Sequence, residues 1–185
     1  MNVTEALLSK NIFSRPGKPL DDVMAIVVHY VGKPGQTAQQ VREYFESLKT
    51  QNAADKQPDR SASAHYAIGL AGSILRLIPE AEKAYHCGAA GYTPEARAFF
   101  GNYCTDPNSS PNRVTIGIEL CHPDDGGQPT PATETAALDL VRDLCWRHEL
   151  DPRTAVWRHY DITAKHCPLW YIDHPDEWER FISLI

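Results

Sequence analysis

Two histidines, a lysine and a cysteine lie close together near the C-terminal end of the chain. The segment 159–168 reads HYDITAKHCP and contains His159, Lys165, His166 and Cys167. Zinc binds imidazole nitrogen and thiolate sulfur, and a catalytic zinc site uses three protein ligands and leaves a fourth position to water. His159 and Cys167 with one distant histidine would complete such a set. Because short His/Cys patterns often occur by chance, solvated histidines and a small core cysteine stay open as the alternative.

Two predicted strands carry further polar residues of interest. The stretch 25–30, AIVVHY, is a continuous apolar run that predicts a buried central strand with His29 at its end. The stretch 114–120, VTIGIEL, alternates, so Glu119 points away from the face that its apolar neighbours bury. A carboxylate in this position is either a candidate acid/base group or an exposed strand glutamate that pairs with a lysine.

The remaining pattern predicts one α/β domain over residues 1–185, with a mixed central sheet flanked by helices. A capping box of Thr37 and Gln40 precedes helical spacing over 38–48, and Thr130 with Pro131 starts another helix with an apolar stripe. The other expected elements are a hairpin of 64–69 and 74–78, a strand over 155–159, a polar loop over 52–60, a short helix over 94–100 and a final helix over 175–184.

Composition limits the classes of partner. The net charge is −6 and no run of Lys and Arg occurs, which argues against nucleic acid. No apolar stretch approaches the roughly 18 residues of a membrane span, and the first ten residues lack the pattern of an export signal, so we expect cytoplasmic synthesis and no membrane partner. The five cysteines are widely spaced without C-x-x-C, so neither a disulfide framework nor a zinc ribbon is indicated.

An ordered set of motifs resembles a known family. These are His29, SAHY at 63–66, YHCG at 85–88, TIGIE at 115–119 and the segment 159–168. In this order they resemble the type 2 N-acetylmuramoyl-L-alanine amidases, in a superfamily that includes phage-lysozyme-type amidases and peptidoglycan recognition proteins. The resemblance runs from about Asn11 to the C-terminus. It implies a zinc site in a surface groove that holds the glycan strand and stem peptide of peptidoglycan.

The resemblance also implies roles for single residues. The zinc ligands would be His29, His159 and Cys167. Glu119 would be the general base, and Lys165 would stabilise the oxyanion. His65 and His86 would contact substrate, or else would hydrogen-bond to a metal ligand or pack in the core.

A second candidate base stays open. One branch of the family carries a tyrosine just before the histidine that corresponds to His65, where this chain has Ala64. Tyr66 is offset from that position by two residues and, on a strand, would point to the same side. We expect a solvated surface position for the histidines that have no family role, which are His122, His148, His166 and His174.

The activity implied is zinc-dependent hydrolysis of the amide bond between N-acetylmuramic acid and L-alanine, in a monomer of the endolysin or autolysin type. The alternatives are a cytosolic recycling amidase for anhydro-muropeptides, which carries Asp where this chain has Cys167, and a non-catalytic peptidoglycan-binding module, which commonly lacks that cysteine. We expect action on the cell wall after release from the cell, and no separate cell-wall-binding domain within these residues.

Overall fold

The computed structural model describes residues 1–51 and 59–185, so most of the loop expected over 52–60 lies outside the described residues. The sheet formed by the described residues has six strands in the order β1-β4-β3-β5-β2-β6. The strands are β1 (Val3–Glu5), β2 (Ala25–Tyr30), β3 (Tyr66–Ile68), β4 (Ile74–Arg76), β5 (Thr115–Leu120) and β6 (Val156–Arg158). The β3–β4 hairpin is antiparallel and the other pairs are parallel, which confirms the mixed sheet.

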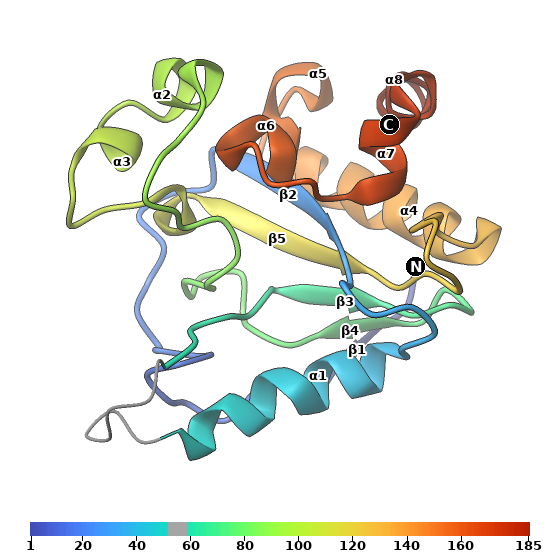
Figure 1. The fold of residues 1–185 in the computed structure, drawn as a ribbon, viewed down its shortest axis with the longest axis horizontal. Helices are drawn as coiled ribbons and strands as arrows, with labels where there is room; N and C mark the ends of the chain where they lie inside the picture. The colour runs from blue at the N-terminus through green and yellow to red at the C-terminus, as the bar shows by residue number, and fades with distance from the viewer. Residues whose placement is uncertain (52–58) are drawn as a thin grey trace.

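Helices connect these strands and cover the sheet (Figure 1). They are α1 (Ala38–Ser47), α2 (Pro94–Phe100), α3 (Asn102–Thr105), α4 (Pro131–Arg147), α5 (Pro152–Ala155), α6 (His159–Thr163), α7 (Leu169–Asp173) and α8 (Pro175–Ser183), with short 3₁₀ turns η1 (Leu48–Thr50) and η2 (Pro111–Arg113). The predictions of α1, α2, α4 and α8 are confirmed. Within residues 1–51 and 59–185, no helix has the length and apolar character needed to cross a bilayer.

One face of the sheet packs into a continuous apolar core. Ile26 and Val28 of β2 and Ile116 and Ile118 of β5 point to this face and are buried. They pack with apolar side chains of α4, α7 and α8. The α4 stripe is buried as predicted, through Ala137, Leu140, Val141, Leu144 and Cys145. This face therefore supplies much of the burial that stabilises the domain.

The opposite face carries two separate apolar clusters. In the first, Phe45 of α1 packs in the same cluster as Ala67 of β3. In the second, Phe100 of α2 and Ile162 of α6 share a cluster with Val27 of β2. Figure 1 shows α1 on one side of β5 and α2 with α6 on the other. The stretch of sheet between the two clusters carries the polar side chains described below.

The helix α1 begins at a complete capping box. The Thr37 hydroxyl accepts a hydrogen bond from the Gln40 backbone N–H at 3.2 Å, and the Gln40 side-chain oxygen accepts one from the Thr37 N–H at 2.9 Å. Two donors that would otherwise lack a partner in the first turn are thereby satisfied, as predicted.

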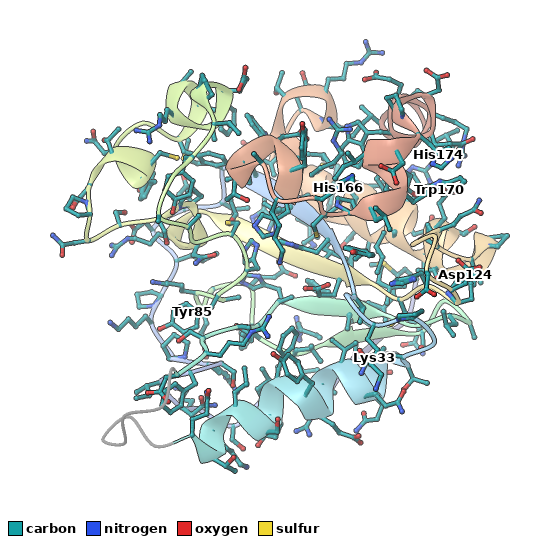
Figure 2. The ribbon with its side chains drawn as sticks, in the orientation of Figure 1. Lys33, Tyr85, Asp124, His166, Trp170 and His174 are labelled. Atoms are coloured by element: carbon teal, nitrogen blue, oxygen red, sulfur yellow. The ribbon has the colours of Figure 1, made fainter. Side chains whose placement is uncertain are left out.

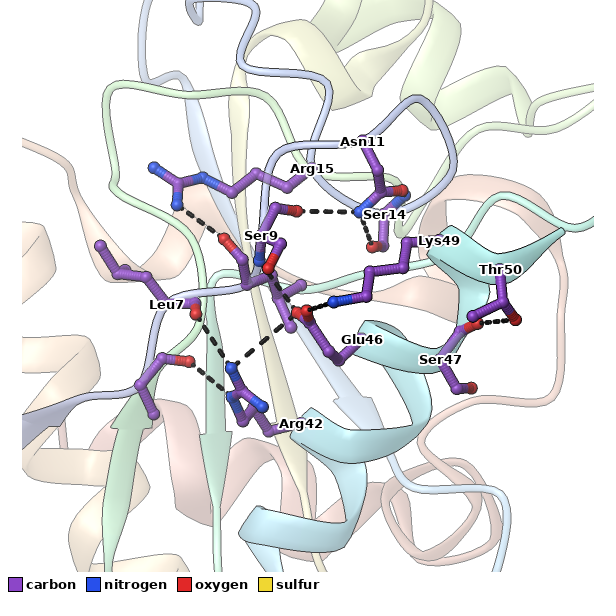
Figure 3. Close-up of polar contacts among 12 residues, drawn as sticks. Leu7, Ser9, Asn11, Ser14, Arg15, Arg42, Glu46, Ser47, Lys49 and Thr50 are labelled. Atoms are coloured by element: carbon purple, nitrogen blue, oxygen red, sulfur yellow. Dashed lines mark hydrogen bonds and ion pairs between the residues drawn. The ribbon is translucent and has the colours of Figure 1, made fainter.

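Polar contacts also fasten the N-terminal segment to α1 (Figure 3). Arg42 donates to the carbonyl oxygens of Ala6 and Leu7, both at 3.2 Å. Glu46 accepts from the Ser9 N–H at 2.9 Å. The segment that follows β1 is therefore held against the helix that forms one wall of the site.

Candidate metal centre and its surroundings

The three predicted zinc ligands come from distant parts of the chain and meet at one place. Nδ1 of His29 lies 3.1 Å from Nδ1 of His159 and 3.7 Å from Sγ of Cys167. One ligand atom from each residue lies within 4.8 Å of the other two. These atoms are close enough together to bind the same ion, because each Zn–N or Zn–S bond is only about 2.0 to 2.3 Å long.

Strand register explains why these residues meet. β6 pairs with β2 in parallel so that Arg158 lies beside Val28. The residue after Val28 is His29 and the residue after Arg158 is His159, so the two histidines are also neighbours. The chain then turns through α6 and returns, and the Tyr160 N–H donates to the Cys167 carbonyl at 2.8 Å. The turn therefore places the Cys167 thiol beside both imidazoles.

Burial gives these donors the chemical character of metal ligands. All three side chains are buried. Burial lowers the pKa of His29 well below its ordinary value and that of His159 to about 4, so both imidazoles are neutral and keep a lone pair. Burial raises the pKa of the Cys167 thiol to about 12, and a bound cation would reverse this effect by stabilising the thiolate. Two neutral imidazoles and one thiol fit a zinc ion.

Glu119 lies next to this cluster. In the parallel β2–β5 pair it is the register partner of His29, so the two side chains lie on the same face of the sheet. Its Oε2 atom is buried and makes no hydrogen bond within the described part of the chain. Burial raises the pKa of Glu119 to about 8, while the positive charge of Lys165 opposes this rise. An unpartnered buried carboxylate oxygen is what a proton-transfer group beside a metal would show.

A cavity of about 540 Å³ opens onto these groups. The side chains of His29, Cys167, Glu119 and Lys165 line it, and Lys165 is exposed. Figure 2 labels three further lining residues that come from different segments, Lys33, Tyr85 and His166. A larger hollow of about 910 Å³ between α2, α5 and α6 contains none of the predicted site residues.

The two histidines predicted to contact substrate lie in different surroundings. His86 lines the cavity, and its Nδ1 lies 3.0 Å from Nε2 of His29. His65 is fully buried, accepts from the Gly117 N–H at 3.0 Å and donates to the Glu82 carbonyl at 2.9 Å. Both ring nitrogens of His65 are thus occupied by backbone groups. Of the alternatives left open for His65, a core position agrees best with these contacts.

The placement expected for Tyr66 is wrong. Tyr66 is the first residue of β3 and packs in the core on the α4 face, whereas Ala64 packs with the α1 cluster. The Tyr66 hydroxyl donates to Glu80, which also binds Arg147 at 2.6 and 2.9 Å. Because Ala64 precedes the strand, the two-residue repeat of a strand does not relate it to Tyr66.

One expectation for the remaining histidines is also wrong. His122 is buried, and its ring nitrogens lie against the carbonyl oxygens of Asp124 and Val31. Backbone acceptors from two loops replace the solvent that we expected around it. His166 and His174 are exposed as expected, and His148 is partly buried against Glu80.

Comparison with known proteins identifies the family. A family profile described as N-acetylmuramoyl-L-alanine amidase matches residues 19–170. Among curated relatives, the chain is 31% identical over 179 residues to the N-acetylmuramoyl-L-alanine amidase BlyA of Bacillus subtilis (strain 168), a match that covers 96% of this chain and 45% of the relative. It is 33% identical over 183 residues to the N-acetylmuramoyl-L-alanine amidase CwlL of Bacillus licheniformis, covering 98% of this chain and 46% of the relative.

This chain therefore belongs to the N-acetylmuramoyl-L-alanine amidase family. It spans slightly less than half the length of these two relatives. Solved structures share its fold. The catalytic domain of XlyA superposes with a TM-score of 0.71 at 24% identity, covering 100% of this chain and 99% of that one. PlyL superposes with a TM-score of 0.72 at 22% identity, covering 99% and 96%.

Proposed function

We propose that this protein is a zinc-dependent amidase that hydrolyses the bond between N-acetylmuramic acid and L-alanine in bacterial peptidoglycan. The observation that carries this proposal is the buried cluster of His29, His159 and Cys167 beside Glu119, whose buried Oε2 has no partner among the described residues. Two of the cluster residues, His29 and Cys167, line an open cavity together with Glu119. Family membership supports the same substrate. A zinc ion held by the three residues would polarise the scissile carbonyl and lower the pKa of a water molecule.

Glu119 would perform the proton transfers. Its carboxylate takes one proton from the attacking water as the oxygen bonds to the lactyl carbonyl carbon. It then gives that proton to the nitrogen of L-alanine as the C–N bond breaks, so the products are a free carboxylic acid and a free amine. Burial raises the pKa of Glu119, which suits a group that must hold a proton between these two steps, and the positive charge of Lys165 favours the carboxylate form that the first step needs.

Lys165 and the cavity walls would complete the reaction site. Lys165 follows α6 and lines the same cavity as Glu119, so its ammonium group can face the oxygen that becomes negative during attack. Aromatic and polar side chains of the opposite wall, including Tyr44 and Tyr85, would hold the glycan and stem peptide. We propose the cell wall as the place of action.

Digestion of purified sacculi followed by mass spectrometry tests the bond. The expected product is a stem peptide with L-alanine at a free N-terminus, absent from a digest with a Glu119→Gln variant. New reducing sugar ends, or cleavage inside the stem peptide, would overturn the proposal. Parallel assays on soluble anhydro-muropeptides separate a wall amidase, which prefers sacculi, from a recycling amidase.

A further inference from the structure

His29 contacts imidazole groups on both sides of its ring. Its Nδ1 faces the metal cluster, at 3.1 Å from His159 and 3.7 Å from Cys167. Its Nε2 faces away from the cluster and lies 3.0 Å from Nδ1 of His86. A neutral imidazole carries one proton, on either nitrogen, and only a nitrogen without a proton binds a metal. The position of that proton therefore decides whether His29 can act as a ligand.

The hydrogen bonds behind His86 determine where the proton lies. The Thr115 hydroxyl donates its only hydrogen to the Pro111 carbonyl at 2.8 Å, so its oxygen can only accept from other groups. Nε2 of His86 lies 3.1 Å from this hydroxyl oxygen and 3.4 Å from the Thr115 carbonyl oxygen. Both are acceptors, so Nε2 of neutral His86 carries the proton. Nδ1 of His86 is then an acceptor, and Nε2 of His29 must donate to it.

We propose that Thr115 and His86 form a positioning relay, which keeps the proton of His29 on Nε2 and leaves Nδ1 free for the metal. The inference rests on the proposed function, because it assumes that an ion occupies the His29, His159 and Cys167 cluster. Neither Thr115 nor His86 belongs to that ligand group; both act through His29. Partners of this kind orient a metal-bound histidine and make it a better ligand.

Packing holds the His86 ring in this place. A Cβ atom at Gly117 would lie 2.6 to 2.9 Å from three atoms of the ring, so any residue other than glycine at this position would displace the ring. The backbone is also restrained, because the Asn112 side-chain oxygen accepts from the N–H groups of His86 and Cys87 at 3.0 and 2.9 Å. The relay is therefore built into β5 and the segment before α2.

Among the described residues, no comparable hydrogen bond fixes the proton position of the second histidine ligand, His159. Nε2 of His159 makes no hydrogen bond to any of the residues that the structure describes, whereas Nδ1 faces His29. With His29 held as an acceptor at Nδ1, His159 must donate its own Nδ1 proton to it, and metal binding must move that proton away. The proton of His29 therefore stays on the same nitrogen when the metal binds, whereas the proton of His159 changes its position.

Nuclear magnetic resonance of the ¹⁵N-labelled histidines tests the relay directly. In chelator-treated wild type we expect protons on Nε2 of both His29 and His86, and on Nδ1 of His159. Zinc should change the proton position of His159 and leave those of His29 and His86 unchanged. A proton on Nδ1 of His29 in the wild type would overturn the proposal. This reading is obtained even if zinc does not bind, so failure of the proposed function is seen separately.

Zinc affinity, measured by competition with a chelator, gives the second readout. His86→Phe and Gly117→Ala should each weaken binding about 10- to 100-fold, the second without removing any polar atom. Thr115→Val should weaken it less. His86→Gln, whose amide can both donate to Thr115 and accept from His29, should recover most of the affinity. The exposed His174→Ala variant is the control. Wild-type affinity in both His86→Phe and Thr115→Val would contradict the relay, and the second variant serves if the first fails to fold.

Discussion

The two faces of the sheet use the same strands for opposite purposes. On the α4 face, Ile116 and Ile118 of β5 join a continuous apolar core. On the other face, Thr115, Gly117 and Glu119 of the same strand lie between two smaller apolar clusters, beside buried histidines. Because side chains alternate along a strand, one short segment can provide packing on one face and chemistry on the other.

This difference shows how buried polar side chains are tolerated on the face of the sheet opposite α4, here called the polar face. Neutral imidazoles and backbone groups satisfy one another there, as His65 does with Gly117 and Glu82. Such pairing limits the cost of burying polar atoms. The Glu119 oxygen is the exception at this site, since it is buried and unpaired within the described residues. Substitutions of Glu119, of the proposed ligands and of the groups that position them should therefore change rate or metal binding, whereas those on the apolar face and at His65 should change stability.

The largest effect on rate is expected from Glu119→Gln. The amide keeps the shape but cannot accept the proton from water, so turnover should fall about 100- to 10,000-fold. Zinc content and thermal stability should stay near those of the wild type. Hydrolysis of a muramoyl-peptide, measured with elemental analysis, checks this, with the exposed Glu43→Gln variant as control. Activity within tenfold of wild type would exclude Glu119 as the base.

Lys165→Met should lower kcat on the order of 100-fold while zinc content is unchanged, because a positive charge facing the developing oxyanion is lost. Lys33 lines the same cavity and is the matched comparison. Lys33→Met should raise KM more than it lowers kcat, as expected for a contact made equally in the ground state. Equal effects of the two substitutions on kcat would remove the special role of Lys165.

Acid should destabilise the polar face through His65. Burial lowers the pKa of folded His65 to about 4 from an ordinary 6.5, so between these values the unfolded chain binds a proton that the folded chain does not. Stability should therefore fall as pH drops from about 6.5 to 4, with a contribution from His65 on the order of 3 kcal/mol. Protonation would also place an N–H of His65 against that of Gly117.

Urea unfolding in the presence of a chelator, at several values of pH between 4 and 7.5, measures this contribution. The His65→Gln variant should show a smaller loss of stability on acidification than the wild type. The exposed His174→Gln variant should behave like the wild type. An unchanged pH dependence in His65→Gln would show that His65 is protonated equally in both states.

The smallest effect on rate is expected from Tyr66→Phe. Its hydroxyl contacts Glu80 on the apolar face, so its loss should cost about 1 kcal/mol of stability and leave turnover unchanged. Glu80 keeps its contact with Arg147 in this variant. Thermal unfolding and the muramoyl-peptide assay measure the two quantities. A loss of activity greater than tenfold would return Tyr66 to the list of candidate bases.

Local sequence patterns were sufficient for the long elements of the fold. The apolar run of β2, the alternation of β5 and the caps of α1 and α4 all predicted what the structure has. Among the short elements, β3, β4 and β6 were predicted from apolar stretches that extend beyond each three-residue strand, whereas β1, α6 and α7 were not predicted. Tertiary packing, rather than local propensity, determines their conformation.

The candidate site could be predicted only in part. The pairing of His29 with His159, 130 residues apart, follows from the family resemblance, since no local pattern relates them. The contribution of Thr115 and Gly117 was missed, because it depends on the position of the His86 ring in the fold. A glycine between the apolar residues of a predicted strand was the available signal, since it often marks a close approach. The roles of the ligands and of Glu119 stay predictions.

The central claim, that the polar face holds a zinc ion between His29, His159 and Cys167, is tested most directly by zinc X-ray absorption on the purified protein. We expect one zinc per chain, with one sulfur at about 2.3 Å and nitrogen or oxygen atoms at about 2.0 to 2.1 Å. In a Cys167→Ser variant the sulfur signal should vanish and zinc affinity should fall. A stoichiometry near zero, or a zinc signal without sulfur in the wild type, would contradict the account.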